Sequence, residues 1–488
     1  MHFFRQIILT SLILGNWLTM ALGATLDETL PRAAALREQG DFKGAAALLK
    51  SDGEKFSVTE QKQIAYQADL LERIRQDYSL KQEELFQELN KSLRNLTKEE
   101  FAKWIHEGRF DSRMIDGVRY FTGTSVSNLY FRYPELNARR RAPKNDAHQK
   151  AVLENCRAIK MAAQKENKFY VLPRHFKATM TVTAEAKAAP SGEMIRAWLP
   201  VPRQYPFQTD FKMLSSSSPV KYLADETSPI RSAYFEQIAR KGQPTEFQIS
   251  YEYITRGIHF DLASKANSTA AIKTENVNQF TQEAPHVVFT DKIKKLAQQL
   301  AGDETDKTAQ AKKFYDWIAG NIKYSFAREY STLTNISDYC YSNGYGDCGQ
   351  EALLFITLCR SQGIPARWQT GWFTFPNAKS IHDWTEIYLA EQGWVPVDPY
   401  MGIFAMRYAT SLSENERREV RDFYFGGLDQ YRMIANSDHN QTLQPPKKTW
   451  RSDDVDFQRG ELESGEINIY FDKYSFDLKV EELPRRTK

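Results

Sequence analysis

Three short motifs within residues 344–399 constrain the fold of this chain more than any other feature. The first, Gly-Tyr-Gly-Asp-Cys-Gly, contains Cys348, the second, Ile-His-Asp-Trp, contains His382, and the third, Val-Asp-Pro, contains Asp398. A thiol, an imidazole and a carboxylate are the three groups that a nucleophile, its base and the orienting partner of that base require. We therefore expect a fold that brings these three side chains together.

Cys348 is expected at the N-terminus of a helix. Asp347 is a good N-cap, and residues 349–362 have a helical pattern that ends at Gly363 and Pro365. Free N–H groups and the helix dipole favour an anion at this end of a helix, so we expect a thiol pKa below its usual value and a nucleophilic thiolate. The same N–H groups can help to hold a developing oxyanion.

His382 and Asp398 are expected on two strands of one hairpin. Residues 381–389 and 394–398 are β-rich runs joined by a short loop, which predicts antiparallel pairing. Cross-strand neighbours on one face lie about 5 Å apart, within reach of a carboxylate–imidazole contact. His382 would then act as the base and Asp398 would orient it. Asp383 is the alternative partner, but adjacent residues on a strand point to opposite faces.

The first 23 residues have the pattern of a secretory signal peptide. Arg5 precedes an apolar run at residues 7–22, which is followed by the small residues Gly23 and Ala24. An uncleaved anchor is the alternative, because the run is nearly long enough for a tilted crossing. No second apolar stretch of about 20 residues follows. We expect a periplasmic or secreted protein without a membrane span after cleavage.

The charge balance argues against a nucleic-acid binder. The chain has 65 basic and 62 acidic residues among 488, a net charge of +3, whereas such proteins show a strong basic excess. The arginine run at residues 139–141 is interpreted as a solvated loop. The sequence contains neither an acidic run typical of a calcium loop nor the Cys-x-x-Cys pairs of a zinc site. We therefore expect no metal and no cofactor.

Only four cysteines occur, at positions 156, 340, 348 and 359. Export permits disulfides, yet so sparse a set is typical of incidental or catalytic cysteines rather than of a disulfide framework. Pairing of Cys340 with Cys348 or Cys156 stays open. Cys359 is expected to be a buried filler, because it lies in mid-helix, away from the positive end of the dipole.

Hydrophobic periodicity separates the first half of the chain into two regions. Residues 24–167 have a helical pattern, with a helix-turn-helix at residues 32–49 and a capping box at residues 97–100, and are expected to form a helical accessory region. Residues 168–262 alternate with period two and are expected to form a small β-sandwich that supports the core or docks substrate.

The second half is expected to contain the catalytic core and a C-terminal extension. The core would span residues 263–435 and include an amphipathic helix at residues 307–323. Residues 436–488 return to period two at 467–471 and 476–480. These two runs predict a closing hairpin, which can complete a sheet begun elsewhere.

Four motifs together resemble the transglutaminase-like superfamily, a branch of the papain-like fold: Gly-x-Gly-Asp-Cys-Gly at 344–349, Gly-Ile-Pro-Ala-Arg at 363–367, His-Asp-Trp-Thr-Glu-Ile at 382–387 and Gly-Trp-Val-Pro-Val-Asp-Pro at 393–399. The resemblance implies an α+β fold. It also implies Cys348 as nucleophile, His382 as base and Asp398 as its partner. Trp384 takes the aromatic position of the histidine motif.

Other parts of the chain bear on this resemblance less directly. Asp347 is expected to line the site, and Tyr324 is a guess for the side chain that donates to the oxyanion. The segment Trp-Leu-Pro-Val-Pro at residues 198–202 resembles the domain that often precedes this core in exported bacterial members. The helical region at residues 24–167 resembles no family that we can name.

The resemblance implies acyl-enzyme chemistry through a thioester. The hypothesis is an exported cysteine peptidase or amidase that acts on protein or cell-wall peptide. Water or an amine decides the second half of such a reaction, so protein-glutamine cross-linking by a transglutaminase is one alternative. A non-catalytic scaffold that binds peptide or glycan is the other.

Overall fold

The computed structural model describes most of the chain, namely residues 25–53, 56–142, 146–262 and 277–484. The predicted signal peptide lies outside these residues. The chain divides into two compact units, of which the first consists of residues up to Glu84 together with Asp111–Gly123. The second consists of Leu85–Phe110 and Thr124–Lys488, and it contains every predicted site residue. No helix in the described ranges is long and apolar enough to cross a membrane.

The first unit packs three helices with a small antiparallel sheet of strand order β1-β3-β2. The predicted helix-turn-helix is present, and Gly40 ends its first helix with a φ of 86°. A core that includes Phe42 and Ile74 holds the unit together. Its elements are α1 (Leu26–Gln39), α2 (Phe42–Gly53), α3 (Val58–Asp77), β1 (Leu80–Lys81), β2 (Ser112–Ile115) and β3 (Val118–Phe121).

The arginine run at residues 139–141 connects helices at the start of the second unit. Arg139 donates to both carboxylate oxygens of Glu100, at 2.6 and 2.8 Å, and Arg140 stacks on the Tyr130 ring. The prediction of a solvated loop is therefore correct only in part, because Arg141 is exposed whereas Arg139, 30% exposed, and Arg140 have partners in neighbouring helices. The elements are α4 (Gln82–Ser92), α5 (Lys98–His106), α6 (Ser125–Arg132), η1 (Pro134–Arg139) and α7 (Ala147–Glu166).

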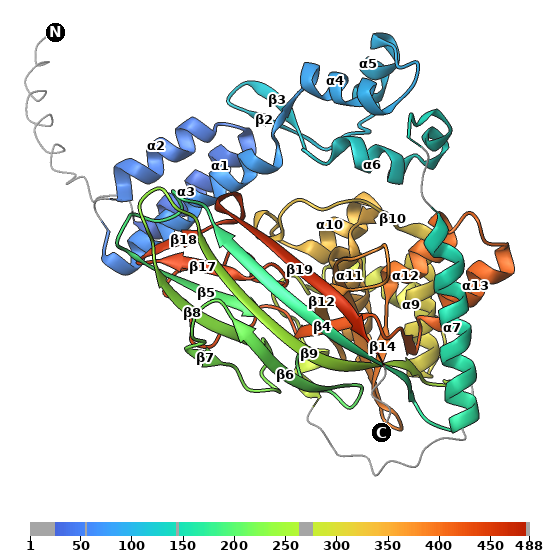
Figure 1. Cartoon of the computed structure of the whole chain (residues 1–488). Coiled ribbons are helices and arrows are strands. Elements are labelled where there is room, and N and C mark those ends of the chain that lie inside the picture. Colours follow the sequence, from blue (N-terminus) through green and yellow to red (C-terminus); the bar gives the residue numbers. More distant parts are fainter. Residues whose placement is uncertain (1–24, 54–55, 143–145, 263–276, 485–488) are drawn as a thin grey trace, which may run out of the picture. The chain divides into compact units, whose positions relative to one another are not determined.

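Two five-stranded sheets form the β-rich part of the second unit, with strand orders β15-β9-β4-β19 (β6 pairing with β9) and β18-β17-β5-β8-β7. The alternating runs predicted as strands are β4 and β9, where Phe176 pairs with Tyr253 and Val182 with Phe247. Figure 1 shows β4, β9 and β19 side by side, with α7 against the ends of β4 and β9. The bounds are β4 (Tyr170–Ala184), β5 (Met194–Pro200), β6 (Gln208–Ser216), β7 (Tyr222–Leu223), β8 (Ser232–Ile238), β9 (Thr245–His259), β15 (Gly427–Leu428), β17 (Glu461–Ser464), β18 (Ile467–Ile469) and β19 (Tyr474–Leu483).

The C-terminal strands belong to both of these sheets. β18 forms a hairpin with β17, which pairs with β5, whereas β19 pairs with β4 along its whole length. The two runs that we predicted as one hairpin, 467–471 and 476–480, therefore do not pair with each other. The turn η5 (Phe471–Lys473) redirects the chain between sheets, and a period-two pattern identifies a strand but not its partner.

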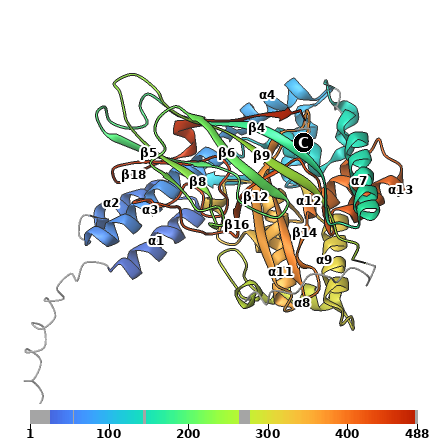
Figure 2. The ribbon, with the colours of Figure 1, turned by 60° about the horizontal axis from the view of Figure 1, so that its bottom comes forward.

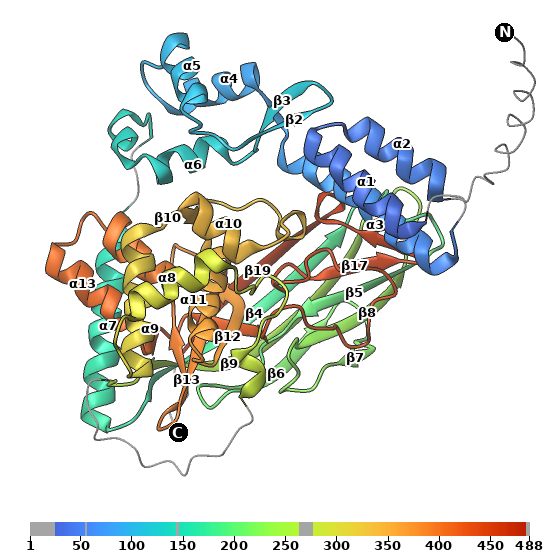
Figure 3. The ribbon, with the colours of Figure 1, turned by 180° about the vertical axis from the view of Figure 1, so that it is seen from behind.

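The remaining elements are a four-stranded antiparallel sheet of order β14-β13-β12-β16 and the helices and short strands around it. Figures 2 and 3 show helices α8, α9 and α11 gathered beside this sheet. Together with the β-rich part they give the predicted α+β fold. The bounds are η2 (Asn278–Thr281), α8 (Asp291–Ala301), α9 (Lys307–Asn321), β10 (Lys323–Tyr324), η3 (Tyr330–Thr332), α10 (Ile336–Asn343), β11 (Tyr345–Gly346), α11 (Cys348–Ser361), β12 (Ala366–Phe373), β13 (Ser380–Leu389), β14 (Gly393–Val397), α12 (Pro399–Ile403), η4 (Phe404–Tyr408), α13 (Glu414–Phe423) and β16 (Arg432–Ser437).

Candidate active site

Cys348 is the first residue of α11, and Asp347 is its N-cap. The Asp347 carboxylate accepts a hydrogen bond from the backbone N–H of Gln350 at 3.0 Å and from the Tyr330 hydroxyl at 2.7 Å. The Gln350 side chain accepts from the Asp347 N–H, which completes a capping box. The helix is buried all round, because α8, α9, α10, β12 and β13 surround it.

Position 349, directly after Cys348, must be a glycine because neighbouring side chains lie very close to its backbone. A Cβ atom at this position would clash with the Tyr330 hydroxyl and would lie 2.8 Å from the Trp368 ring. The glycine therefore lets the Tyr330 hydroxyl reach Asp347 directly beside the first turn of α11.

His382 and Asp398 meet as the hairpin geometry predicted. β13 pairs with β14 so that Thr385 lies opposite Val397, and Asp398 follows as the N-cap of α12. The His382 Nε2 atom lies 2.9 Å from Asp398 Oδ2. The other carboxylate oxygen accepts the Met401 backbone N–H at 3.0 Å. The carboxylate is thus held from two sides, and the imidazole is aligned by a buried anion.

Arg432 completes this arrangement, and sequence reasoning missed it. Its Nη1 atom lies 2.9 Å from Asp398 Oδ2, and its Nε atom donates to Asp429 at 2.9 Å. The guanidinium also lies over the Trp384 ring, 5.1 Å from its centroid. Arg432 is 1% exposed, on the fully buried strand β16. A charged residue beside Met433 and other apolar residues was the only signal in the sequence.

Opposing effects set the pKa values of the imidazole and its carboxylate partner. Burial raises the pKa of Asp398, but His382 and Arg432 outweigh it and hold that pKa below its usual value. Burial lowers the pKa of His382, and Asp398 offsets only part of this. At neutral pH the pair is therefore a neutral imidazole beside an ionised carboxylate.

The thiol of Cys348 differs from our expectation. Burial, together with the carboxyl groups of Asp383 and Asp347, raises its pKa well above the usual value. Its sulfur donates a hydrogen bond to Asp383 Oδ2 at 3.5 Å. Desolvation and neighbouring carboxyl groups outweigh the helix N-terminus here, so the resting group is a thiol and not the thiolate that we predicted.

Cys348 and His382 line one cavity of about 330 Å³. Trp384 is buried beside it and stacks on the His382 ring, with centroids 5.7 Å apart. Tyr324 also lines the cavity, and its ring packs against Tyr400 at 5.1 Å. Burial and Cys348 raise the pKa of Tyr324, so its phenol is a neutral hydrogen-bond donor near the sulfur.

Part of the cavity comes from a segment that the sequence did not associate with the site. Asp453, Asp456, Gln458 and Arg459 line it together with Cys348. These residues lie between β16 and β17, in a stretch without regular secondary structure. We had assigned residues 436–488 to an extension, and no periodic pattern connects this stretch to the motifs at 344–399.

The remaining cysteines are not among the residues that line the cavity. Cys156, Cys340 and Cys359 are buried free thiols, and burial raises the pKa of each. No group of three or more His, Cys, Asp or Glu side chains in the described part of the chain could hold a metal ion.

Comparison with curated proteins finds distant relatives of uncharacterised function. Protein YebA of Bacillus subtilis is 25% identical over 131 residues, which cover 23% of this chain and 18% of that protein. An uncharacterised protein of Haemophilus influenzae is 23% identical over 238 residues, which cover 43% of this chain and 63% of that protein. The chain thus spans less than two thirds of either relative.

Two solved structures are similar at a low level. A candidate cysteine protease from Cytophaga hutchinsonii has a TM-score of 0.41 and 16% identity, covering 66% of this chain and 94% of that one. The periplasmic domain of TgpA from Pseudomonas aeruginosa has a TM-score of 0.26 and 15% identity, covering 54% and 96%. The match to a family model is more direct, because it includes the motifs of Cys348, His382 and Asp398. Residues 294–399 match the transglutaminase-like superfamily, and the chain carries a domain of this superfamily.

Proposed function

We propose that this protein is an exported, cysteine-dependent amide hydrolase or acyl transferase that forms a thioester on Cys348. The observation that carries the proposal is the buried His382–Asp398 pair, with its 2.9 Å contact, in the same cavity as the Cys348 thiol. A buried acceptor aligned on one imidazole nitrogen leaves the other nitrogen, Nδ1, for proton transfer. The protein or peptide substrate and export to the periplasm or medium are parts of the same proposal.

The first half-reaction starts from neutral groups. The raised pKa of Cys348 and the lowered pKa of His382 favour thiol and imidazole over an ion pair. The thiol proton therefore moves to His382 as the sulfur bonds to the substrate carbonyl carbon and the carbonyl electron pair moves to oxygen. When the tetrahedral intermediate collapses, the C–N bond breaks and His382 gives its proton to the leaving amine.

The second half-reaction releases the acyl group. Water or an amine attacks the thioester carbonyl, His382 removes its proton, and the thiol leaves as the C–S bond breaks. Asp398 stabilises the transient imidazolium in both halves, because its lowered pKa keeps it ionised. The Cys348 backbone N–H, at the first position of α11, and the phenol of Tyr324 are the proposed donors to the oxyanion.

The test compares wild-type protein with Cys348→Ala. Both are incubated with an amide-linked peptide library and with cell-wall peptides, and released amines are measured. A parallel assay follows incorporation of a fluorescent primary amine into a glutamine-rich protein. We expect turnover in at least one assay and its loss in Cys348→Ala. Cys359→Ala, a buried thiol elsewhere on the same helix, is the matched control and should keep activity. Equal turnover by Cys348→Ala and wild type would disprove the proposal.

A further inference from the structure

One wall of the cavity is rich in carboxyl groups. Asp453 and Asp456 come from the segment between β16 and β17, Asp383 from β13, and Glu329 from the loop before η3, and all four line the cavity together with Cys348. We call these four residues the acidic wall. The transglutaminase-like match at residues 294–399 does not include Asp453 or Asp456.

The partners of the acidic wall leave it with an excess of acceptors. Arg459 donates to both carboxylate oxygens of Glu329, at 2.9 and 2.7 Å, and its Nη2 atom lies 3.3 Å from Asp453. Among the described residues Asp383 accepts from neutral groups, namely the Cys348 thiol, the Gln458 amide and the Thr370 hydroxyl. Asp456 is 5% exposed, and its carboxylate has neither a hydrogen bond nor an ion pair within the described ranges.

A separate observation concerns the Gln458 amide. Its nitrogen donates to Asp383 at 2.7 Å, to the Thr370 hydroxyl at 2.6 Å and to the His382 carbonyl at 3.1 Å. Its oxygen is buried and has no hydrogen-bond partner among the described residues. A buried acceptor without a donor is costly. Gln458 therefore presents an unpaired acceptor next to the acidic wall, where the buried Nε atom of Arg459 also has no acceptor among the described residues.

Burial and mutual repulsion raise the pKa values of two carboxyl groups in the acidic wall. Burial, and then repulsion by Asp453 and Asp383, raises the pKa of Asp456 well above its usual value. Burial raises the pKa of Asp453 to about 7, although Arg459 opposes this. Crowded, desolvated carboxyl groups retain protons because Arg459 contacts only two of the four, Glu329 and Asp453, and cannot balance them all. A ligand with a positive charge and N–H donors can take the place of those protons.

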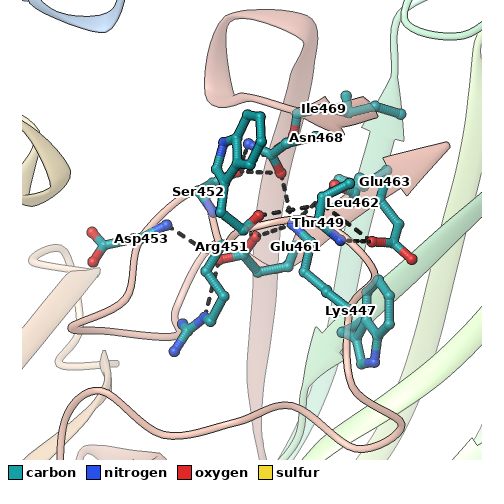
Figure 4. A network of polar contacts seen from close by, with 12 residues as sticks. Lys447, Thr449, Arg451, Ser452, Asp453, Glu461, Leu462, Glu463, Asn468 and Ile469 are labelled. Carbon is teal, nitrogen blue, oxygen red and sulfur yellow. Dashed lines mark hydrogen bonds and ion pairs between the residues drawn. The ribbon is translucent and has the colours of Figure 1, made fainter. Parts of the chain in front are cut away.

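The segment that carries half of this wall has no helix or strand, but a network of hydrogen bonds and ion pairs holds it. Lys447 contacts Glu461 at 2.7 Å and Asn468 at 2.6 Å, and Glu463 accepts the backbone N–H of Thr449 at 3.1 Å. Figure 4 shows this network, which also includes Arg451 and the backbone of Ser452. The segment is thereby pre-organised, so little entropy is lost when a ligand binds to it.

We propose that the acidic wall binds a primary ammonium group of the substrate, close to the carbonyl that Cys348 attacks. The part of this statement that concerns attack rests on the proposed function. An ammonium group is a compact cation with three donors, which suits carboxylates and an amide oxygen. A metal ion is a poorer fit, because none of the carboxyl clusters in the described residues has a metal-binding arrangement. The substrate class is therefore an amide with an amino group near its acyl carbon.

The test uses two reagents of nearly equal size, 2-aminoethyl methanethiosulfonate, which is cationic, and its neutral 2-hydroxyethyl analogue. Each forms a disulfide with a thiolate and releases methanesulfinate. The rate with Cys348 is divided by the rate of the same reagent with 2-mercaptoethanol. The ratio of the two normalised rates is the charge preference, measured at pH 8, where Asp453 is ionised.

We expect a charge preference of about tenfold in wild type, and its loss in Asp456→Asn and Asp453→Asn, since one charge pair in a partly desolvated site accounts for that factor. Glu419→Gln removes an exposed carboxylate that pairs with Arg157 and should leave the preference unchanged. Cys348→Ala identifies the reacting thiol, and circular dichroism establishes that each variant is folded.

The outcomes separate this proposal from the proposed function. A charge preference near one in wild type would overturn ammonium binding, and so would a preference that both Asp→Asn variants retain. His382→Ala addresses the proposed function instead, because it should slow the neutral reagent. An unchanged rate of the neutral reagent in His382→Ala would contradict the role of His382 as base and would leave the charge preference standing.

Discussion

Strand β13 bears ionisable groups on adjacent residues, and the two groups have contrasting surroundings. His382 contacts Asp398, which in turn contacts Arg432, so that every charge in this group has a partner. Asp383, the next residue, is hydrogen-bonded to neutral groups. It lies near Asp456, whose carboxylate has no hydrogen bond or ion pair in the described residues, although Arg459 and Arg451 lower its pKa from a distance. Paired charges fix the position of an imidazole, whereas unbalanced carboxyl groups are suited to a ligand that brings its own charge.

The contrast extends to how stability depends on pH. The folded pKa of Asp398 lies below its unfolded value, so its stabilisation is present above the unfolded pKa and is lost as the pH falls through the folded pKa. Asp453 has a folded pKa of about 7, above its unfolded value. It therefore costs stability progressively as the pH rises from about 4 to about 7.

The largest expected effect is the loss of kcat when Asp398, the charged partner of His382, is replaced. Asp398→Asn should lower kcat by about 1,000-fold or more, because the imidazole loses the anion that sets its tautomer and stabilises its cation. Steady-state kinetics on the substrate found in the library screen would measure this. Asp429→Asn is the matched control, because Asp429 contacts Arg432 but not His382, and its kcat should fall much less. Equal losses in both variants would remove the distinction.

Arg432→Met tests how much the paired charges around Asp398 contribute to the stability of the fold. The variant leaves Asp398 and Asp429 buried without their cation, so the free energy of unfolding should fall by about 3–5 kcal/mol. Urea denaturation followed by tryptophan fluorescence would measure it. Arg157→Met, which removes the arginine of an exposed ion pair with Glu419, should produce no measurable change. A similarly small effect of Arg432→Met would mean that the buried network does not hold the site.

Asp453→Asn should change the free energy of unfolding in the direction opposite to that of Arg432→Met. Replacing a carboxyl group of raised pKa by a neutral amide removes the cost of its ionisation, so the variant should be more stable than wild type at pH 8 by about 1–3 kcal/mol. At pH 4 the difference should vanish, because the wild-type carboxyl group is protonated there in the folded state. Thermal unfolding across this pH range would measure both. Destabilisation at pH 8 would show that Arg459 already balances the acidic wall.

The smallest effect concerns a residue outside β13. Tyr324→Phe removes one of the proposed oxyanion donors, and kcat should fall by about tenfold, the value of one hydrogen bond. Tyr400→Phe is the comparison, because the two rings touch and both line the cavity. If only Tyr400→Phe lowers kcat, the donor is Tyr400 and the guess made from the sequence is wrong.

Much of the core was predictable because its signals are local. Asp347, Gly363 and Pro365 define the ends of α11, and the short loop between β13 and β14 defines their antiparallel pairing. Such features depend on residues close together in the chain, where backbone sterics and capping act. The alternation that predicted β4 and β9 is of the same kind.

Other parts required the tertiary structure because their signals are not local. β18 and β19 look like two arms of one hairpin, yet each pairs with a strand from the first half of the chain. The thiol pKa also depends on which groups surround the helix N-terminus, and carboxyl groups and burial reverse the effect expected of the helix dipole. Neither a strand partner nor a local dielectric environment is encoded in the spacing of nearby residues.

The sequence by itself determined which side chains can carry chemistry: Cys348 opening a helix, His382 on a strand and Asp398 at the end of the next. It did so because helix capping, strand alternation and the family motifs each depend on residues that lie close together in the chain. Only the tertiary structure decided which charges meet them. Arg432 reaches Asp398 from β16, and Asp453 and Asp456 reach the cavity from a segment that follows β16. Those contacts depend on how distant strands pack, and electrostatic effects follow distance in space and burial, not distance along the chain.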